Sequence, residues 1–297
     1  MKRLFLLLFS LFSLTAHADL KVFATVPEWG ALASVIGGKH VDVFTATGGL
    51  QDPHRVEAKP SLIARARNAD MIVATGAELE VGWLPVVLRN SGNPHVQPGQ
   101  PGYFEAAPKV RMLEVPIRLD RADGDVHAGG NPHIQTDPRN FLKIGAALAT
   151  RLGQLDAANA SEYQANFRNF AERWKMAIAK WEIVAAPLRG VPVVTQHKAF
   201  PYLYDWLGIV EVGTLEPKPG VEPSVSHLGE VVADVETKKP RMVIRAAWNS
   251  SRPSEWFSEH AHLPAVTLPF TVGGSDQAKD LFGLFDDTVA QLLKAIK

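Results

Sequence analysis

Residues 157–188 read AANASEYQANFRNFAERWKMAIAKWEIVAAPL, and this stretch decides the predicted fold. It contains no glycine, and its first proline is Pro187. Large apolar side chains recur in it at steps of three and four residues, the spacing of one face of an α-helix. These side chains are Tyr163, Phe167, Phe170, Trp174, Ile178 and Trp181. A helix of roughly thirty residues is about 45 Å long, enough to run along two lobes, so we predict a linking helix over residues 156–188.

Strand and helix patterns alternate on both sides of this helix, which predicts parallel sheets covered by helices. The predicted strands are Lys21–Val26, Val41–Thr47, Met71–Thr75, Arg111–Ile117, Val191–Thr195, Val210–Leu215, Met242–Ala246 and Ala265–Pro269. The other predicted helices are Pro27–Ile36, Pro60–Ala69, Leu79–Leu88, Asp137–Gly153, Phe200–Leu207, Ser224–Thr237, Ser254–His260 and Ala278–Ile296. The predicted fold class is α/β, with two lobes, each a mainly parallel sheet flanked by helices, joined by one long rigid helix. We place the lobes at residues 19–155 and 189–297.

The first 18 residues are predicted to be a signal peptide rather than part of the fold. Lys2 and Arg3 precede an apolar run over Leu4–Leu14, and Ala16-His17-Ala18 is a small-x-small cleavage site. We expect a soluble, exported protein after cleavage. Because the chain has no cysteine, the bacterial periplasm is the expected location.

Composition excludes several classes of function. The 297 residues include 31 basic and 31 acidic side chains, so the chain lacks the positive charge of a general nucleic-acid binder. The absence of cysteine excludes disulfides, thiolate zinc sites, cysteine nucleophiles and lipid attachment through an N-terminal cysteine.

Three histidines lie in turns near the predicted strand and helix ends. His54 follows the strand Val41–Thr47, His197 follows Val191–Thr195, and His133 precedes the helix that starts at Asp137. Ligands of α/β proteins bind beyond the carboxyl ends of strands, so the three side chains can converge between the lobes. Imidazole is a common zinc ligand; each histidine alone would be an ordinary polar loop residue, but the three together favour a metal site.

These motifs resemble the periplasmic metal-binding receptors of bacterial zinc and manganese ABC transporters. The matching segments are Asp52-Pro53-His54, Asn131-Pro132-His133, His197-Lys198-Ala199-Phe200 and Glu222-Pro223-Ser224. The resemblance spans essentially the whole chain after residue 18 and implies two α/β lobes joined by a long helix. It also implies that His54, His133 and His197 are metal ligands and that a membrane permease receives the metal.

The resemblance favours zinc over manganese, because members with histidine at the third position tend to bind zinc. Ligand chemistry agrees, since manganese prefers more oxygen ligands. We expect a monomer that binds no nucleic acid; a periplasmic metallochaperone is a candidate donor of the metal.

Family members usually carry an aspartate near the final strand, where this chain has Phe270-Thr271. Asp276 is the nearest substitute, either as a fourth metal ligand or as the N-cap of the closing helix. Glu57 can orient an imidazole or serve as a first-turn acid. The usual long His- and Asp-rich loop is missing, and only Asp123, Asp125 and His127 form a small cluster. His127 can transfer metal, shield the site, or be a solvated loop residue.

The leading functional prediction is a zinc-binding receptor that delivers metal to an ABC permease for uptake, without enzymatic activity. The alternative is a zinc-dependent hydrolase, because three histidines and a bound water also form a catalytic site. No His-Glu-x-x-His motif supports that alternative.

Overall fold

The computed structural model describes residues 19–118, 124 and 126–297. The predicted signal peptide (residues 1–18), Asp123 and Asp125 lie outside these described residues. Within them, none of the helices has both the length and the apolar character that crossing a membrane requires.

The N-terminal lobe is built on a parallel sheet with strand order β2-β1-β3-β4. Its strands are β1 (Leu20–Ala24), β2 (Val41–Thr45), β3 (Met71–Ala74) and β4 (Tyr103–Glu105). Its helices are α1 (Pro27–Gly37), α2 (Pro60–Arg67), α3 (Leu84–Ser91) and α4 (Pro138–Leu155). All four residues of β3 are buried, as expected for a parallel strand that is covered on both faces.

The C-terminal lobe repeats this arrangement with strand order β6-β5-β7-β8, also parallel. Its strands are β5 (Pro192–Thr195), β6 (Val210–Thr214), β7 (Val243–Ala246) and β8 (Ala265–Leu268). Its helices are α6 (Pro201–Leu207), α7 (Val225–Glu236), α8 (Arg252–Ala261) and α9 (Leu281–Ala295). The predicted α/β fold with two sheets flanked by helices is confirmed, whereas the exact division of the chain into lobes stays a prediction.

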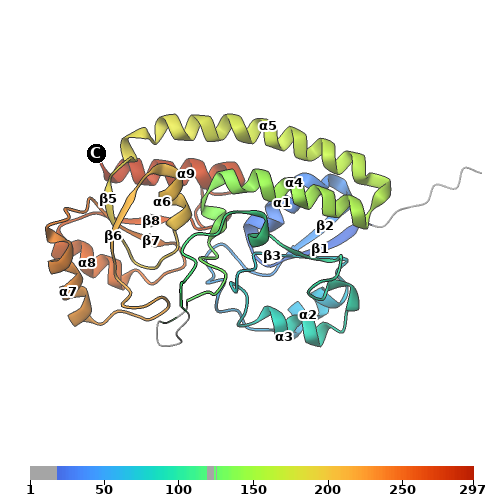
Figure 1. The fold of residues 1–297 in the computed structure, drawn as a ribbon, viewed down its shortest axis with the longest axis horizontal. Coiled ribbons are helices and arrows are strands. Elements are labelled where there is room, and N and C mark those ends of the chain that lie inside the picture. The colour runs from blue at the N-terminus through green and yellow to red at the C-terminus, as the bar shows by residue number, and fades with distance from the viewer. Residues whose placement is uncertain (1–18, 119–123, 125) are drawn as a thin grey trace, which may run out of the picture.

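The predicted linking helix corresponds to α5 (Ala160–Val184), which is 25 residues long. Short 3₁₀ turns at Ala157–Asn159 and Ala186–Leu188 flank it. Figure 1 shows α5 running along the top of the molecule over both lobes. Most of its predicted apolar stripe is buried, and Phe167 is partly buried.

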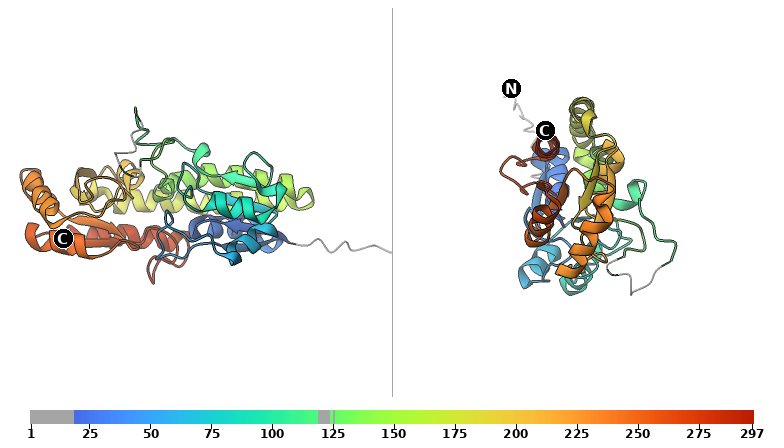
Figure 2. Two further views of the ribbon diagram at one scale, coloured as in Figure 1. Left: turned by 90° about the horizontal axis from the view of Figure 1, so that it is seen from below. Right: turned by 90° about the vertical axis from the view of Figure 1, so that its left-hand side faces the viewer.

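An aromatic cluster beneath α5 joins helices from both halves of the chain. The ring of Trp174 lies 5.4 Å from Phe141 of α4 and 4.8 and 5.6 Å from Phe282 and Phe285 of α9, measured between ring centroids. One continuous apolar core includes Val73 of the first sheet and Ile244 of the second. The two further views in Figure 2 show how α5 and α9 run along the molecule. The lobes are therefore packed together and not merely tethered.

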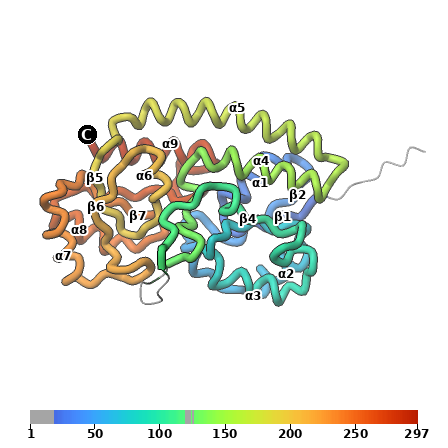
Figure 3. The backbone as a smooth tube through the Cα atoms, viewed as in Figure 1, coloured from blue at the N-terminus to red at the C-terminus, as the bar shows by residue number. Residues whose placement is uncertain are grey.

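The segment between β4 and α4 differs from its prediction. β4 (Tyr103–Glu105) was not predicted, and the predicted strand Arg111–Ile117 is absent from the described residues of that range. The backbone of Leu113 bonds instead to the Tyr202 hydroxyl and to the Asn131 amide, so it joins no strand ladder. Figure 3 traces this segment along the boundary between the lobes.

Candidate metal centre

The structure brings His54, His133 and His197 together. Each offers one ring nitrogen, and these nitrogens lie within 4.8 Å of one another. The Nε2 atoms of His54 and His133 are 3.0 Å apart, although the residues are separated by 79 positions in the chain. His54 lies on the loop after β2 and His197 lies two residues after β5, so the predicted convergence of strand ends from two lobes is what the structure shows.

The same kind of turn, closed by a hydrogen bond from the backbone to a side chain, holds His54 and His133. In each Asx-Pro-His turn, the first side chain accepts a hydrogen bond from the histidine amide: Asp52 Oδ1 at 2.9 Å and Asn131 Oδ1 at 3.0 Å. Such side-chain turns fix the backbone locally. The Trp83 indole also donates to the Pro53 carbonyl at 3.0 Å, which holds the first turn against the buried side of its lobe.

Hydrogen bonds at Nδ1 direct two of the rings. His133 Nδ1 lies 3.0 Å from the Lys198 carbonyl oxygen, and His197 Nδ1 lies 2.8 Å from Glu216 Oε2. A carbonyl or carboxylate can only accept, so both Nδ1 atoms carry a proton, and Nε2 is the nitrogen of each ring that can offer a lone pair. His197 Nε2 is buried and has no hydrogen-bond partner in the protein. A buried unpartnered acceptor of this kind suits a metal ion.

Aromatic side chains border the imidazoles, and burial shifts the pKa of two of them. Trp248 lies 5.4 Å from the His197 ring and Phe270 lies 5.3 Å from the His133 ring. Burial, followed by the nearby His197, lowers the pKa of His54 to about 3. Burial, followed by His54 and His197, lowers the pKa of His133 as well. A neutral imidazole is the form that binds metal, so these two rings are ready to act as ligands at neutral pH.

His127 lies beside the cluster. Its ring is stacked on that of His54, with 5.4 Å between centroids and 22° between planes. Together with His133, His197, Lys198 and other residues it lines a cavity of about 250 Å³. The side chain of His127 is partly buried beside His54, and its role in transfer, in shielding or as a loop residue stays a prediction.

Asp276 is not brought into the histidine cluster. It is exposed, and the cap of α9 is Asp280, whose Oδ1 accepts from the Gly283 amide at 2.8 Å. The glycine-rich turn before it serves a different purpose: a Cβ at Gly49 would overlap the backbone of Gly273, so glycine lets the His54 loop approach the second lobe. The cap role predicted for Asp276 is wrong, and its ligand role finds no support in this arrangement.

Glu57 fits neither of its predicted roles, because α2 begins at Pro60 and has no acid in its first turn. Its side chain is 80% exposed and lies 3.9 Å from Lys59. Glu216, an acid that contacts the clustered imidazole of His197, was missed, although it directly follows the predicted strand Val210–Leu215. The placement after a strand, which identified two of the histidines, was the signal that could have found it.

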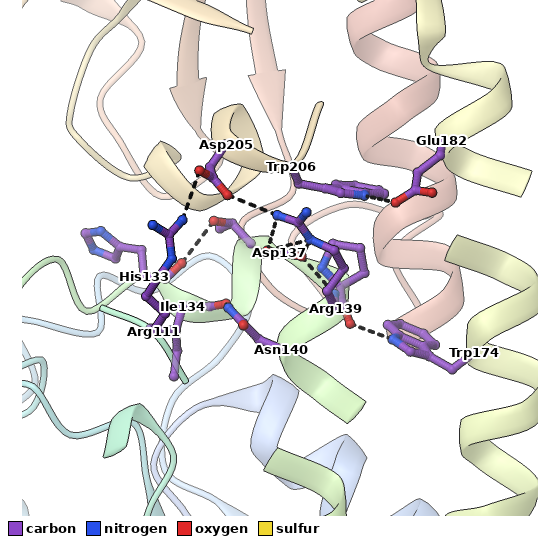
Figure 4. Close-up of polar contacts among 12 residues, drawn as sticks. Arg111, His133, Ile134, Asp137, Arg139, Asn140, Trp174, Glu182, Asp205 and Trp206 are labelled. Carbon is purple, nitrogen blue, oxygen red and sulfur yellow. Dashed lines mark hydrogen bonds and ion pairs between the residues drawn. The ribbon is translucent and has the colours of Figure 1, made fainter. Parts of the chain in front are cut away.

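Ion pairs across the lobes support the turn that carries His133 (Figure 4). Asp137 caps α4 by accepting from the Arg139 amide at 2.8 Å, and the Arg139 guanidinium bonds to Asp137 at 2.8 Å and to Asp205 of α6 at 3.1 Å. Arg111 contacts the other oxygen of Asp205 at 3.1 Å. The N-cap of α4, four residues after His133, is thereby tied to the second lobe.

The chain has two parallel-sheet lobes, a rigid helix that runs along both, and a histidine cluster between them. These features define a metal-binding receptor of the two-lobed α/β class. A family model described as "Zinc-uptake complex component A periplasmic" matches residues 22–295, and the chain belongs to this family.

Individual relatives and structures support the same class. SloC, a metal ABC transporter substrate-binding lipoprotein of Streptococcus mutans, is 24% identical over 275 residues, or 90% of this chain and 87% of SloC. PsaA, a manganese ABC transporter substrate-binding lipoprotein of Streptococcus pneumoniae, is 22% identical over 272 residues, or 90% of this chain and 84% of PsaA. The structure of FpvC from Pseudomonas aeruginosa in complex with Mn²⁺ has the same fold, with a TM-score of 0.80, 22% identity, and coverage of 94% of this chain and 98% of FpvC.

Members of this family are substrate-binding proteins of ABC transporters and not enzymes. The protein is accordingly a metal-binding receptor of an ABC transporter. The alternative prediction of a zinc-dependent hydrolase is wrong.

Proposed function

We propose that this receptor binds one Zn²⁺ ion as its cargo through the Nε2 atoms of His54, His133 and His197 and delivers it to a membrane permease for uptake. The observation that carries the proposal is the convergence of three imidazoles, one of which presents a buried Nε2 without a protein partner.

The donor set supports zinc. Three neutral nitrogen ligands suit Zn²⁺, whereas Mn²⁺ forms weaker complexes and prefers oxygen. Among the described residues, no carboxylate oxygen belongs to the cluster. Relatives of this chain include proteins named for manganese and for iron, so the proposal rests on the ligands of this chain and not on the names.

The cavity beside the cluster supports an open fourth position. It borders His133 and His197 and has a volume of about 250 Å³, enough room for water. Zinc with three protein ligands commonly takes water as the fourth. An ion held in this way is bound at the edge of the cavity. This position suits a receptor, because a receptor must be able to release its cargo.

The permease is the expected partner. The sequence suggested three further parts of the proposal. The protein acts as a monomer, it is soluble in the periplasm, and a periplasmic metallochaperone supplies its metal.

The test is a zinc competition titration of the purified protein, metal-free, with a chromophoric chelator. His133→Ala should weaken zinc binding by orders of magnitude, because it removes a ligand and the geometry of the other two. His95→Ala is the matched control, since His95 is exposed and outside the cluster, and it should bind zinc normally.

Two results would contradict the proposal. If the triple substitution of His54, His133 and His197 left zinc affinity unchanged, the assignment of these residues as ligands would be wrong. If the unmodified protein bound Mn²⁺ more tightly than Zn²⁺, the assignment of zinc as the cargo would be wrong.

A further inference from the structure

Glu216 is a largely buried carboxylate directly behind the cluster. It follows β6 and Leu215, and its side chain is only 11% exposed. Its Oε2 accepts two hydrogen bonds, one from His197 Nδ1 at 2.8 Å and one from the Gly220 amide at 2.8 Å. The carboxylate is therefore fixed in position and directed at the ring nitrogen on the far side of His197 from Nε2.

The two buried rings have different acceptors. His133 Nδ1 faces a neutral backbone carbonyl, that of Lys198, whereas His197 Nδ1 faces a carboxylate. A carboxylate behind an imidazole fixes its tautomer and makes the opposite nitrogen a stronger donor. His197 therefore has the stronger support as a ligand of the two.

We infer that Glu216 is a positioning residue that holds His197 with its Nε2 lone pair facing the ion and strengthens that lone pair, so that the site favours zinc over manganese. This inference rests on the proposed function, because it concerns how the same site holds its cargo. The resulting increase in affinity is larger for zinc than for manganese, since imidazole nitrogen is a better ligand for zinc.

The turn around Glu216 also joins the two lobes. The Gly220 carbonyl accepts from Arg55 Nη2 at 3.1 Å, and Arg55 follows His54 directly. Gly220 has a φ of 76°, a conformation that favours glycine. A single turn, residues 216–220, thus contacts the ring of His197 at one end and the neighbour of His54 at the other. Glu216 therefore sets the orientation of His197 relative to the ligand from the opposite lobe.

Two other roles for Glu216 make different predictions. As a direct ligand it would need an oxygen in the cluster, but the cluster comprises only the three histidine nitrogens among the described residues. As a purely structural turn residue it would bond to Gly220 and leave the tautomer of His197 unaffected.

The first measurement is long-range ¹H–¹⁵N NMR of the histidine side chains in the metal-free protein. We expect His197 to be protonated at Nδ1 in the unmodified protein and to show mixed tautomers in Glu216→Ala. Protonation of His197 at Nε2 in the unmodified protein would overturn the inference without the need for any variant to fold.

The second measurement compares metal affinities of Glu216→Gln, which retains an oxygen acceptor but removes the charge. Zinc affinity should fall roughly 10- to 100-fold, with a smaller fall for Mn²⁺ and a changed absorption spectrum of the Co²⁺-substituted protein. Glu57→Gln is the control, because Glu57 is exposed, and it should behave like the unmodified protein.

The outcomes separate this inference from the proposed function. If His133→Ala loses zinc but Glu216→Gln binds it normally, only the role of Glu216 is overturned. A loss of thermal stability in Glu216→Gln with unchanged zinc affinity and Co²⁺ spectrum likewise leaves Glu216 structural. If His133→Ala binds zinc normally, the proposed function itself fails.

Discussion

Replacing Glu28 by glutamine should remove a pH dependence from the stability of this protein. Glu28 lies in the first turn of α1 and is 1% exposed. The hydroxyl of Thr271, from the loop after β8 in the other lobe, donates to its Oε2, and its Oε1 is buried without a partner. Burial raises the pKa of Glu28 to about 7, and nearby Glu80 adds to the rise, while the hydrogen bond from Thr271 opposes it.

The magnitude follows from this pKa. The ordinary value is 4.5, so between pH 4.5 and about 7 the native protein binds a proton that the unfolded chain has released. The free energy of unfolding therefore falls as pH rises through this window and is level above it. A shift of roughly 2.5 pH units corresponds to about 3 kcal/mol. Glutamine cannot ionise, so Glu28→Gln should match the unmodified protein near pH 4.5 and be more stable by about 3 kcal/mol at pH 8.

The assay is urea unfolding of the metal-free protein from pH 4.5 to pH 8, followed by tryptophan fluorescence. The difference between the two proteins isolates Glu28, because the other shifted groups occur in both. One of these is His54, whose lowered pKa removes stability as pH falls below 6.5. Glu57→Gln serves as the control for the loss of a carboxylate. A difference that stays constant across this pH range would refute the reasoning.

Three other predictions test the packing and the caps. Asp280→Ala should lower the free energy of unfolding, measured with urea, by about 1 kcal/mol, because the α9 cap is lost. Asp276→Ala should change neither the free energy of unfolding nor the zinc affinity. A loss of zinc affinity in Asp276→Ala would show that Asp276 is a ligand. Trp174→Ala should cost about 3–5 kcal/mol because its ring is fully buried between α4, α5 and α9, and a loss below about 1 kcal/mol in urea unfolding would contradict that packing. Small-angle scattering should give nearly the same radius of gyration with and without zinc, because α5 has no glycine or proline at which to bend, and a change of several ångströms would contradict a rigid connection.

The long helix could be predicted because its pattern is local. Residues such as Phe170, Trp174 and Trp181 repeat at helical spacing, and no partner is needed to recognise them. β4 could not be predicted in this way. It has only three residues, Tyr103–Glu105, and its strand character depends on pairing with β3.

The predicted strand Arg111–Ile117 failed for the opposite reason. Its composition suits a strand, but no neighbouring strand pairs with it among the described residues, and Leu113 bonds to Tyr202 and Asn131 instead. The three histidines could be predicted because each lies in a turn at the end of an element. Asp276 and Asp280 could not be told apart from sequence, because both are acids near the start of a helix. The closing helix begins at Leu281 and not at the predicted Ala278, so Asp280 is the residue at its N-cap.

In the proposed site, the separation of the histidines along the chain determines when the ion can be bound. His54 and His133 are 79 residues apart, and His197 lies in the second lobe, after another long segment. In an unfolded chain, bringing these side chains to one point requires the closure of two long loops at an entropic cost, unlike a motif whose ligands are neighbours in sequence. The nitrogens meet only when both sheets have formed and docked beneath α5. For the proposed site, tight metal capture is therefore expected only late in folding, and a newly made polypeptide should not trap the ion before its two sheets have docked.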